Sequence, residues 1–191
     1  KTYRGLQVEL IKADAAQIII EGNRSSEVTV KNNNGTLKIS MSLTHTFSAD
    51  DVMVYLYYTK DIDVIDANEG SHIFSDEVFE QEKLTAKAQE AGRIKLEINT
   101  EHLDVSVVTG GQVNLKGTAK NQNVKANTGG IYKGERLESE YTKVSSYTGG
   151  IADVKASSLV DAKASTGGVI SINGEPEEVK KSESLGGYVR Q

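Results

Sequence analysis

The sequence predicts an all-β fold, a single-stranded right-handed parallel β-helix whose chain winds as a solenoid with coils of about 18–20 residues. The first observation is a Thr-Gly-Gly phrase that begins at residues 109, 128, 148 and 166 and recurs as Leu-Gly-Gly at residue 185, in steps of 19, 20, 18 and 19 residues. The second is that apolar residues alternate with polar ones on both sides of each phrase. The predicted corners between coils are formed by Thr109, Gly110, Gly111, Thr128, Gly129, Gly130, Thr148, Gly149, Gly150, Thr166, Gly167, Gly168, Gly186 and Gly187.

Composition narrows the classes of partner. The chain has 191 residues, a net charge of −5 and a pI near 5.3, and its 22 Lys and Arg residues are scattered, so a nucleic-acid partner is not expected. There is no cysteine and no run of 18 apolar residues, which leaves no disulfide, no thiolate metal site and no predicted membrane span. Because the sequence begins at Lys1 without Met, we expect that a leader or anchor has been removed during export.

We expect one β-helix domain over residues 1–191, with irregular N-terminal coils in residues 1–66 and regular coils in residues 67–191. The N-terminal part contains short alternating runs and turn signals such as Asn34-Gly35, which tolerates positive φ. The pattern predicts strands within residues 6–10, 18–20, 28–30, 36–41 and 52–58, and a loop over residues 43–51. Residues 77–91 also fit a helix, but the alternation in Leu84-Thr-Ala-Lys-Ala before a Gly turn favours a strand.

The regular repeats can be aligned on the second glycine of each phrase. Apolar or small residues occupy the positions two and four residues after this glycine and two and four residues before the phrase, which predicts two short strands per coil with an inward-facing set. An antiparallel meander with hairpins at the glycines is the alternative. Matching inward positions favour parallel stacking, and so does the outward series Asp104, Asn123, Lys143, Asp161 and Lys180, whose neighbours are mostly neutral or opposite in charge.

The winding is predicted to be right-handed because the hexapeptide rhythm of left-handed β-helices is missing. The last repeat carries Lys181 and Glu183 at its inward positions, which is typical of a polar cap that ends the stacking.

The corner phrases, the short alternating strands and the opening Tyr3-Arg4-Gly5-Leu6-Gln7-Val8 together resemble the putative auto-transporter adhesin, head GIN domain family of bacterial envelope proteins. The resemblance extends from Tyr3 to the closing Gly186-Gly187-Tyr188-Val189. It implies a right-handed β-helix, export to the periplasm or the outer cell surface, and an adhesive role. It supplies no catalytic residue and no cofactor.

One candidate interface follows from the residue after each second glycine, which faces outward in this alignment. Three adjacent coils then expose apolar side chains, and a contiguous apolar stripe on a soluble chain often marks an interface for self-association or for another partner. A register slip of one residue, or a loop over the stripe, is the alternative. The predicted stripe consists of Ile131, Ile151 and Val169, with Tyr147 and Tyr188 beside it.

Other candidate sites have ordinary structural explanations. The threonines and glycine amides of the corners could bind an anion or a sugar, but we expect the glycines to supply positive φ while stacked Thr hydroxyls bond one another. Asp61, Asp63, Asp66 and Glu69 could hold calcium, although alternating acids on a strand are usually its solvated face.

The sequence therefore predicts an exported, non-catalytic envelope module without catalytic residues, metal or cofactor, acting on a cell-surface glycan or protein or by self-association. The alternative is a carbohydrate-active enzyme on the same scaffold, a polysaccharide lyase or hydrolase. Hydrolysis needs two carboxyl groups about 5–9.5 Å apart, and the acids Asp104 and Asp161 are three coils apart in the alignment.

Overall fold

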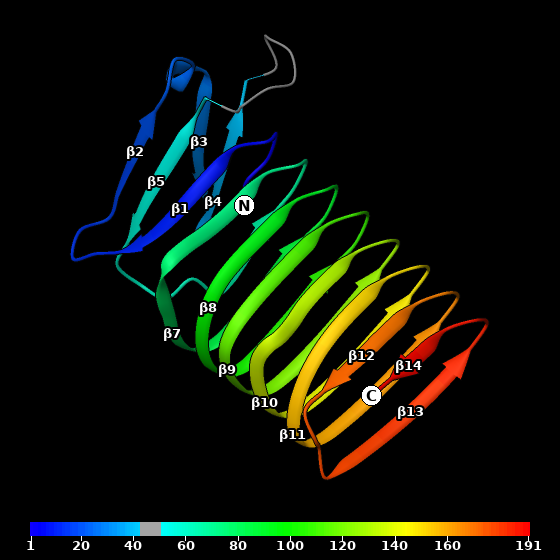
Figure 1. Cartoon of the computed structure of the whole chain (residues 1–191). Helices are drawn as coiled ribbons and strands as arrows, with labels where there is room; N and C mark the ends of the chain where they lie inside the picture. Colours follow the sequence, from blue (N-terminus) through cyan, green and yellow to red (C-terminus); the bar gives the residue numbers. More distant parts are fainter. Residues whose placement is uncertain (43–50) are drawn as a thin grey trace.

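The computed structural model describes residues 1–42 and 51–191 of the chain, which form a parallel β-solenoid of about seven turns (Figure 1). The predicted loop at residues 43–51 lies, except for Asp51, outside the described residues. A short 3-10 helix, η1, spans Ser25–Glu27. The strands are β1 (Gln7–Lys12), β2 (Gln17–Glu21), β3 (Val28–Asn33), β4 (Thr36–Met41), β5 (Met53–Tyr58), β6 (Val64–Ala67), β7 (His72–Ala88), β8 (Arg93–Val107), β9 (Gln112–Asn127), β10 (Ile131–Tyr147), β11 (Ile151–Ser165), β12 (Val169–Asn173), β13 (Glu178–Ser184) and β14 (Tyr188–Arg190).

Each regular coil is one long strand that bends in the middle, so that its first half lies on one face of the solenoid and its second half on the other (Figure 1). From β7 to β11 every neighbouring pair runs parallel, which confirms the predicted stacking over the antiparallel alternative. The helix considered for residues 77–91 does not form, because β7 extends as far as Ala88. We call the half after each corner the first face and the half before the next corner the second face.

The interior is filled by the apolar residues that the alignment placed inward. In β9, Val113, Leu115, Val124 and Ala126 each have 0% of their surface exposed. The same positions stack from coil to coil, as in the pairs Ile94–Val113 and Val105–Val124. Burial of these side chains between two sheet faces about 10 Å apart supplies the main stabilisation of the fold.

Each corner is a tight turn of the type I′ kind, closed by a hydrogen bond from the second glycine. In the corner after β10, Gly150 N donates to Tyr147 O at 2.9 Å, while Thr148 and Gly149 adopt φ of 49° and 71°. Neighbouring corners are also bonded to each other, since Gly129 N donates to Thr148 O at 3.2 Å. A β-branched threonine at positive φ is strained, so the corner holds Thr148 in a conformation that it does not favour by itself.

The two glycines of a corner have different functions: the first has the positive φ expected of glycine at a corner, and the second does not. The second glycine has an ordinary φ but lies against the backbone of the preceding coil: a Cβ on Gly150 would be 2.4 Å from Ala126 O. A Cβ on Gly149 would meet nothing within 4 Å. In the part of the chain that the structure describes, the four corner Thr hydroxyls do not hydrogen-bond one another, so their stacking is not held by a hydroxyl ladder.

The N-terminal part differs from a row of irregular coils. β1 pairs with the start of β7, and β6 pairs with the end of β7, so β1 and β6 are the two halves of the first coil. Residues 13–63 are an insertion between them. In the insertion, β5 lies parallel to β1, β2 runs antiparallel to β5, and β3 and β4 form an antiparallel hairpin through the predicted Asn34-Gly35 turn (Figure 1). The insertion covers the N-terminal end of the solenoid.

At the other end, β13 pairs with β11 and β14 begins a further coil against β12. Lys181 and Glu183 occupy inward positions, paired with Ala162 and Ala164, but both are exposed because β13 belongs to the last coil of the stack. The Glu183 carboxylate accepts a hydrogen bond from Val189 N at 2.6 Å. The Glu183 side chain thus provides a hydrogen-bond acceptor for a backbone N–H at the end of the stack. This arrangement is consistent with the predicted polar cap.

The close approach at the corner predicts unequal effects of two adjacent substitutions. Gly150→Ala should lower the free energy of unfolding by more than Gly149→Ala, because its Cβ overlaps the backbone of the preceding coil. We expect about 1–2 kcal/mol for Gly149→Ala, the cost of the left-handed conformation, and at least about 1–3 kcal/mol more for Gly150→Ala from overpacking. Urea unfolding of the two variants measures the difference; equal losses would contradict the assignment of the two glycines.

Candidate functional site

The predicted apolar stripe lies on the first face, in one vertical row. The outward pairs are Ile131–Ile151, Ile151–Val169 and Val169–Tyr188, so the row is in register across β10, β11, β12 and β14. Ile151 and Tyr188 are 39% and 57% exposed, while Ile131 and Val169 are half-buried. Tyr147 is 38% exposed and precedes the corner that leads to Ile151, which places it on the second face.

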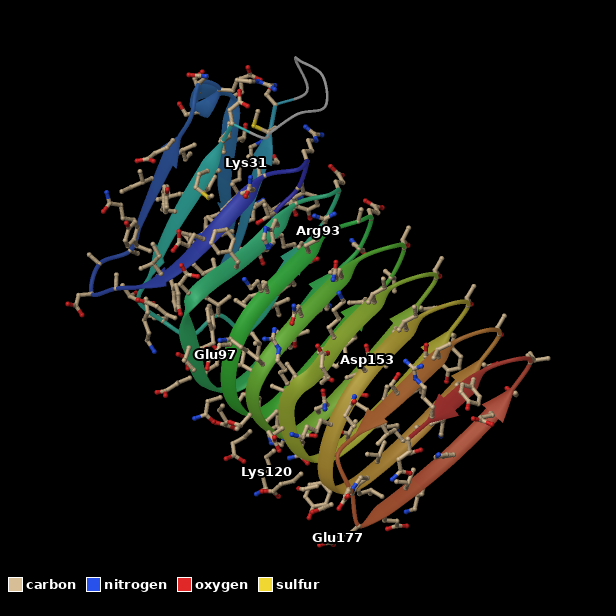
Figure 2. All side chains as sticks on the ribbon, viewed as in Figure 1. Lys31, Arg93, Glu97, Lys120, Asp153 and Glu177 are labelled. Carbon is tan, nitrogen blue, oxygen red and sulfur yellow. The ribbon has the colours of Figure 1, made fainter. Side chains whose placement is uncertain are left out.

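Toward the N-terminus the residues of this row become polar. Ile131 pairs with Gln112, and Gln112 pairs with Arg93. Figure 2 shows the side chains on the ribbon, with Arg93 at this row and Asp153 in the next outward row of the same face. The apolar part of the row therefore begins at β10 and continues to β14.

A shallow groove of about 430 Å³ crosses the second face over β8 to β11. Two outward rows line it. One row is the predicted polar series, and the structure confirms its pairs Asp104–Asn123, Asn123–Lys143, Lys143–Asp161 and Asp161–Lys180. The other row contains His102, Asn121, Tyr141 and Leu159, paired in that order.

The groove exposes an aromatic ring beside polar groups that are free to meet a ligand. Tyr141 is 45% exposed. Asn123 donates from Nδ2 to Asp104 Oδ1 at 2.8 Å, which fixes both side chains. Lys143 and Asp161 form no ion pair within 4.0 Å among the described residues. The groove therefore combines one apolar surface with a cation, an anion and amides.

A buried hydrogen-bond network lies directly beneath this groove. Gln122 Nε2 donates to Thr142 Oγ1 at 2.9 Å and to Ser139 Oγ at 3.2 Å, while Gln122 Oε1 accepts from the Tyr132 hydroxyl at 2.7 Å. Tyr132 extends across the interior from the first face, and a Cβ on Gly134 would be 2.5 Å from its ring.

Complete burial raises the pKa of the Tyr132 phenol well above its ordinary value, so the hydroxyl stays protonated and remains the donor to Gln122. A fully satisfied network of this kind fixes the backbone that carries the groove.

Most of the remaining predicted candidates take part in structural contacts. Of the four acids considered for calcium, Asp66 is buried, 2.9 Å from Lys1 Nζ, and Glu69 lies 3.5 Å from Arg4 Nε. No three His, Asp or Glu side chains of the described residues gather as a metal site.

The corner amides of Gly110, Gly129 and Gly149 donate to the Thr carbonyl of the following corner, at 3.2–3.3 Å, so they are not free for an anion. The corners are accordingly structural features in the geometry observed here.

The row that contains Tyr141 was not identified from the sequence, although the signal was present. Each residue of this row lies seven positions before a corner threonine; the row consists of His102, Asn121, Tyr141 and Leu159. These positions are outward by the same alternation that gave the polar row at minus five. Gln122 is the inward residue between these two outward rows in β9. Because it is polar, it interrupts the apolar alternation of the strand, and the outward row that contains Tyr141 cannot be recognised from that alternation.

No helix among the residues that the structure describes is long and apolar enough to cross a bilayer.

The sequence matches a family model over residues 1–176; the family is described as "putative auto-transporter adhesin, head GIN domain". No protein with a curated description matches the chain.

Solved structures share the fold. A putative adhesin from Bacteroides fragilis NCTC 9343 is 16% identical and superposes with a TM-score of 0.85, over 100% of this chain and 92% of that chain. A putative adhesin from Parabacteroides merdae ATCC 43184 is 13% identical with a TM-score of 0.70, over 99% and 89%. A putative lipid binding protein from Parabacteroides distasonis ATCC 8503 is 16% identical with a TM-score of 0.68, over 98% and 92%. At these identities the likeness shows the fold alone.

Proposed function

Because the chain belongs to the putative auto-transporter adhesin, head GIN domain family, we propose that it is a non-catalytic binding module of the bacterial cell envelope. In this proposal the protein is exported to the periplasm or the outer cell surface and binds a surface glycan in the groove of the second face. The observation that carries the proposal is the exposed ring of Tyr141 beside the unpaired Lys143 and Asp161, over four coils in register.

The chemistry of the groove supports a glycan ligand. Sugars have apolar C–H faces and many hydroxyl groups, so they need an amphipathic ring together with polar partners. Tyr141 provides a rigid ring at low entropic cost, and its hydroxyl is a further hydrogen-bonding group. Asn121, Lys143 and Asp161 provide acceptors and donors in the neighbouring positions. The buried network of Gln122 and Thr142 holds these positions before a ligand arrives.

The groove favours binding over hydrolysis. Asp104 and Asp161 are separated by Asn123 and Lys143 in the same row, which is three steps of about 4.8 Å, or about 14 Å in total. Glycoside hydrolysis requires carboxyl groups about 5–9.5 Å apart. The carbohydrate-active enzyme that the sequence left as an alternative therefore has less support than a binding module.

The proposal predicts that Tyr141→Ala weakens glycan binding at least tenfold, since truncation of a central aromatic side chain costs more than about 1.4 kcal/mol. Tyr147→Ala is the matched control, because Tyr147 lies on the same strand with similar exposure but outside the groove. A glycan array identifies the ligand, and titration calorimetry measures both variants.

Equal losses in the two variants, or unchanged affinity in Tyr141→Ala, would remove the groove as the site. Release of reducing sugar from a bound glycan would favour the enzyme instead.

We also propose that the apolar stripe of Ile131, Ile151, Val169 and Tyr188 joins two copies of the chain. The stripe is continuous over four strands, and its most exposed members, Ile151 and Tyr188, lie toward the C-terminal end. Contact between the stripes of two copies would remove these apolar side chains from water, which favours association.

The substitution pair Ile131→Asp and Ile151→Asp should convert the oligomer to a monomer, because it places two charges in the centre of the contact. Light scattering measures the mass, and circular dichroism verifies that the fold is kept. The matched control is Arg93→Asp with Gln112→Asp, which adds acids to the polar part of the same row. Self-association is refuted if the unmodified protein is monomeric or if the stripe variant keeps its mass.

A further inference from the structure

A cleft of about 800 Å³ lies at the N-terminal end of the solenoid and is lined by residues of β1, β5 and β4 and by the segment that leads from β5 to β6. The hairpin belongs to a separate two-stranded sheet, and the isolated bridge from Thr2 to Ile39 ties it to the N-terminus. The volume is within the range of about 300–1,000 Å³ that small-molecule sites occupy. The cleft is on a different part of the molecule from the groove of the second face.

The walls of the cleft are apolar. Leu10 of β1 and Leu56 of β5 line one side, Leu37 and Ile39 of β4 line the other, and Ile73 of β7 lies where the cleft meets the first regular coil. Val8 of β1 and Ile65 of β6, which are also buried core residues, complete this apolar part of the lining.

The insertion is packed less completely than the coils. Among the described residues, eight half-buried apolar residues pack against the core, and seven of them belong to the insertion, namely Ile18, Ile20, Val28, Val30, Leu37, Leu56 and Ile62. In the coils the corresponding inward side chains, such as Val113 and Ala152, are 0% exposed. Three residues of this set, Leu37, Leu56 and Ile62, also line the cleft, so their open apolar surface is available to an apolar ligand, whereas Leu10, Ile39 and Ile73 are buried.

The mouth of the cleft is polar and carries unpaired lysines. Ala16, Asn34 and the segment 59–63 surround it. Two acids of the lining are in ion pairs: the buried Asp66 lies 2.9 Å from Lys1 Nζ, and Asp61 lies 4.0 Å from Lys12 Nζ. Lys60, Lys87 and Asp63 also line the cleft.

Among the described residues, none of these three has an ion-pair partner within 4.0 Å. These three side chains, two lysines and one aspartate, together carry a net charge of +1.

We propose that this cleft binds the acyl chain of a single-chain amphiphile, with the chain between β1, β5 and β4 and an anionic head at Lys60 and Lys87. The apolar part of the lining suits an acyl chain, and the polar part suits a charged head in contact with water. A fatty acid, with its carboxylate, and a lysophospholipid, with its phosphate, both carry an anionic group next to a single acyl chain. The site operates independently of glycan binding in the groove of the second face, so the two proposals succeed or fail separately.

Calorimetric titration tests whether the acyl chain is bound in the cleft. The ligands are octanoate, decanoate, dodecanoate, tetradecanoate and hexadecanoate, each below its micellar concentration. Affinity should rise about fourfold for each added methylene, the factor that corresponds to burial of one CH₂ group, until the cleft is full. A parallel titration with lysophosphatidylcholine distinguishes a free fatty acid from a lipid as the source of the chain. Binding of either amphiphile with this dependence supports the proposal; failure of both to bind overturns it.

Two variants locate the binding. Ala16→Trp places a large side chain at the mouth from an exposed position, and should weaken hexadecanoate binding at least tenfold without affecting the fold. Lys60→Glu should weaken binding of hexadecanoate more than of lysophosphatidylcholine, because only the former has a net negative head. Ile151→Asp, on the distant stripe, is the control and should bind as the unmodified protein does. Unchanged affinity in Ala16→Trp, or affinity that does not depend on chain length, refutes the cleft as the site.

Discussion

The whole structure depends on how closely the backbone of one coil approaches the backbone of the next at the corner. The second glycine of each corner lies against the carbonyl of the preceding coil, where any side chain would overlap it. Two successive residues at positive φ turn the chain, and the first of them is a threonine that is strained in this conformation. Hydrogen bonds from corner to corner then maintain the stacking. Since the corners recur at nearly the same spacing, they set the register of both faces.

Because the register between coils is fixed, inward residues stabilise the fold while outward residues face solvent. Inward positions such as Val113 and Val124 are fully buried, while outward positions of the same strands meet solvent. Rows with different chemistry therefore form on one scaffold: an apolar row on the first face and a polar row with Tyr141 on the second. The buried network of Gln122 and Tyr132 is the exception inside, where polar groups replace apolar ones and Gly134 leaves space for the ring.

The period and the alternation were sufficient to predict the regular coils, because each coil repeats a local pattern. The coil-to-coil pairs have the register that they predicted for the rows of Asp104 and of Ile131, and the family that the motifs resemble is the family to which the chain belongs, while the role of the Ile131 row as an interface stays a prediction. The insertion of residues 13–63 into the first coil was not predictable from local pattern, since β1 and β6 are joined only through their pairing with β7. Nor was the groove, because Gln122 interrupts the alternation at the strand that carries it. The right-handed winding stays a prediction of the sequence.

The most direct test of the account uses the natural absence of cysteine in the chain. Asn123 and Lys143 are partners in adjacent coils, so cysteines at both positions should have Cα atoms about 4.8 Å apart and oxidise to a disulfide within one molecule. Cysteines at Asn123 and Tyr147 lie four positions out of register and should stay reduced under the same conditions. Mass spectrometry of the oxidised proteins decides between the two arrangements. A disulfide in the second pair and none in the first would contradict the in-register parallel stacking on which every surface described above depends.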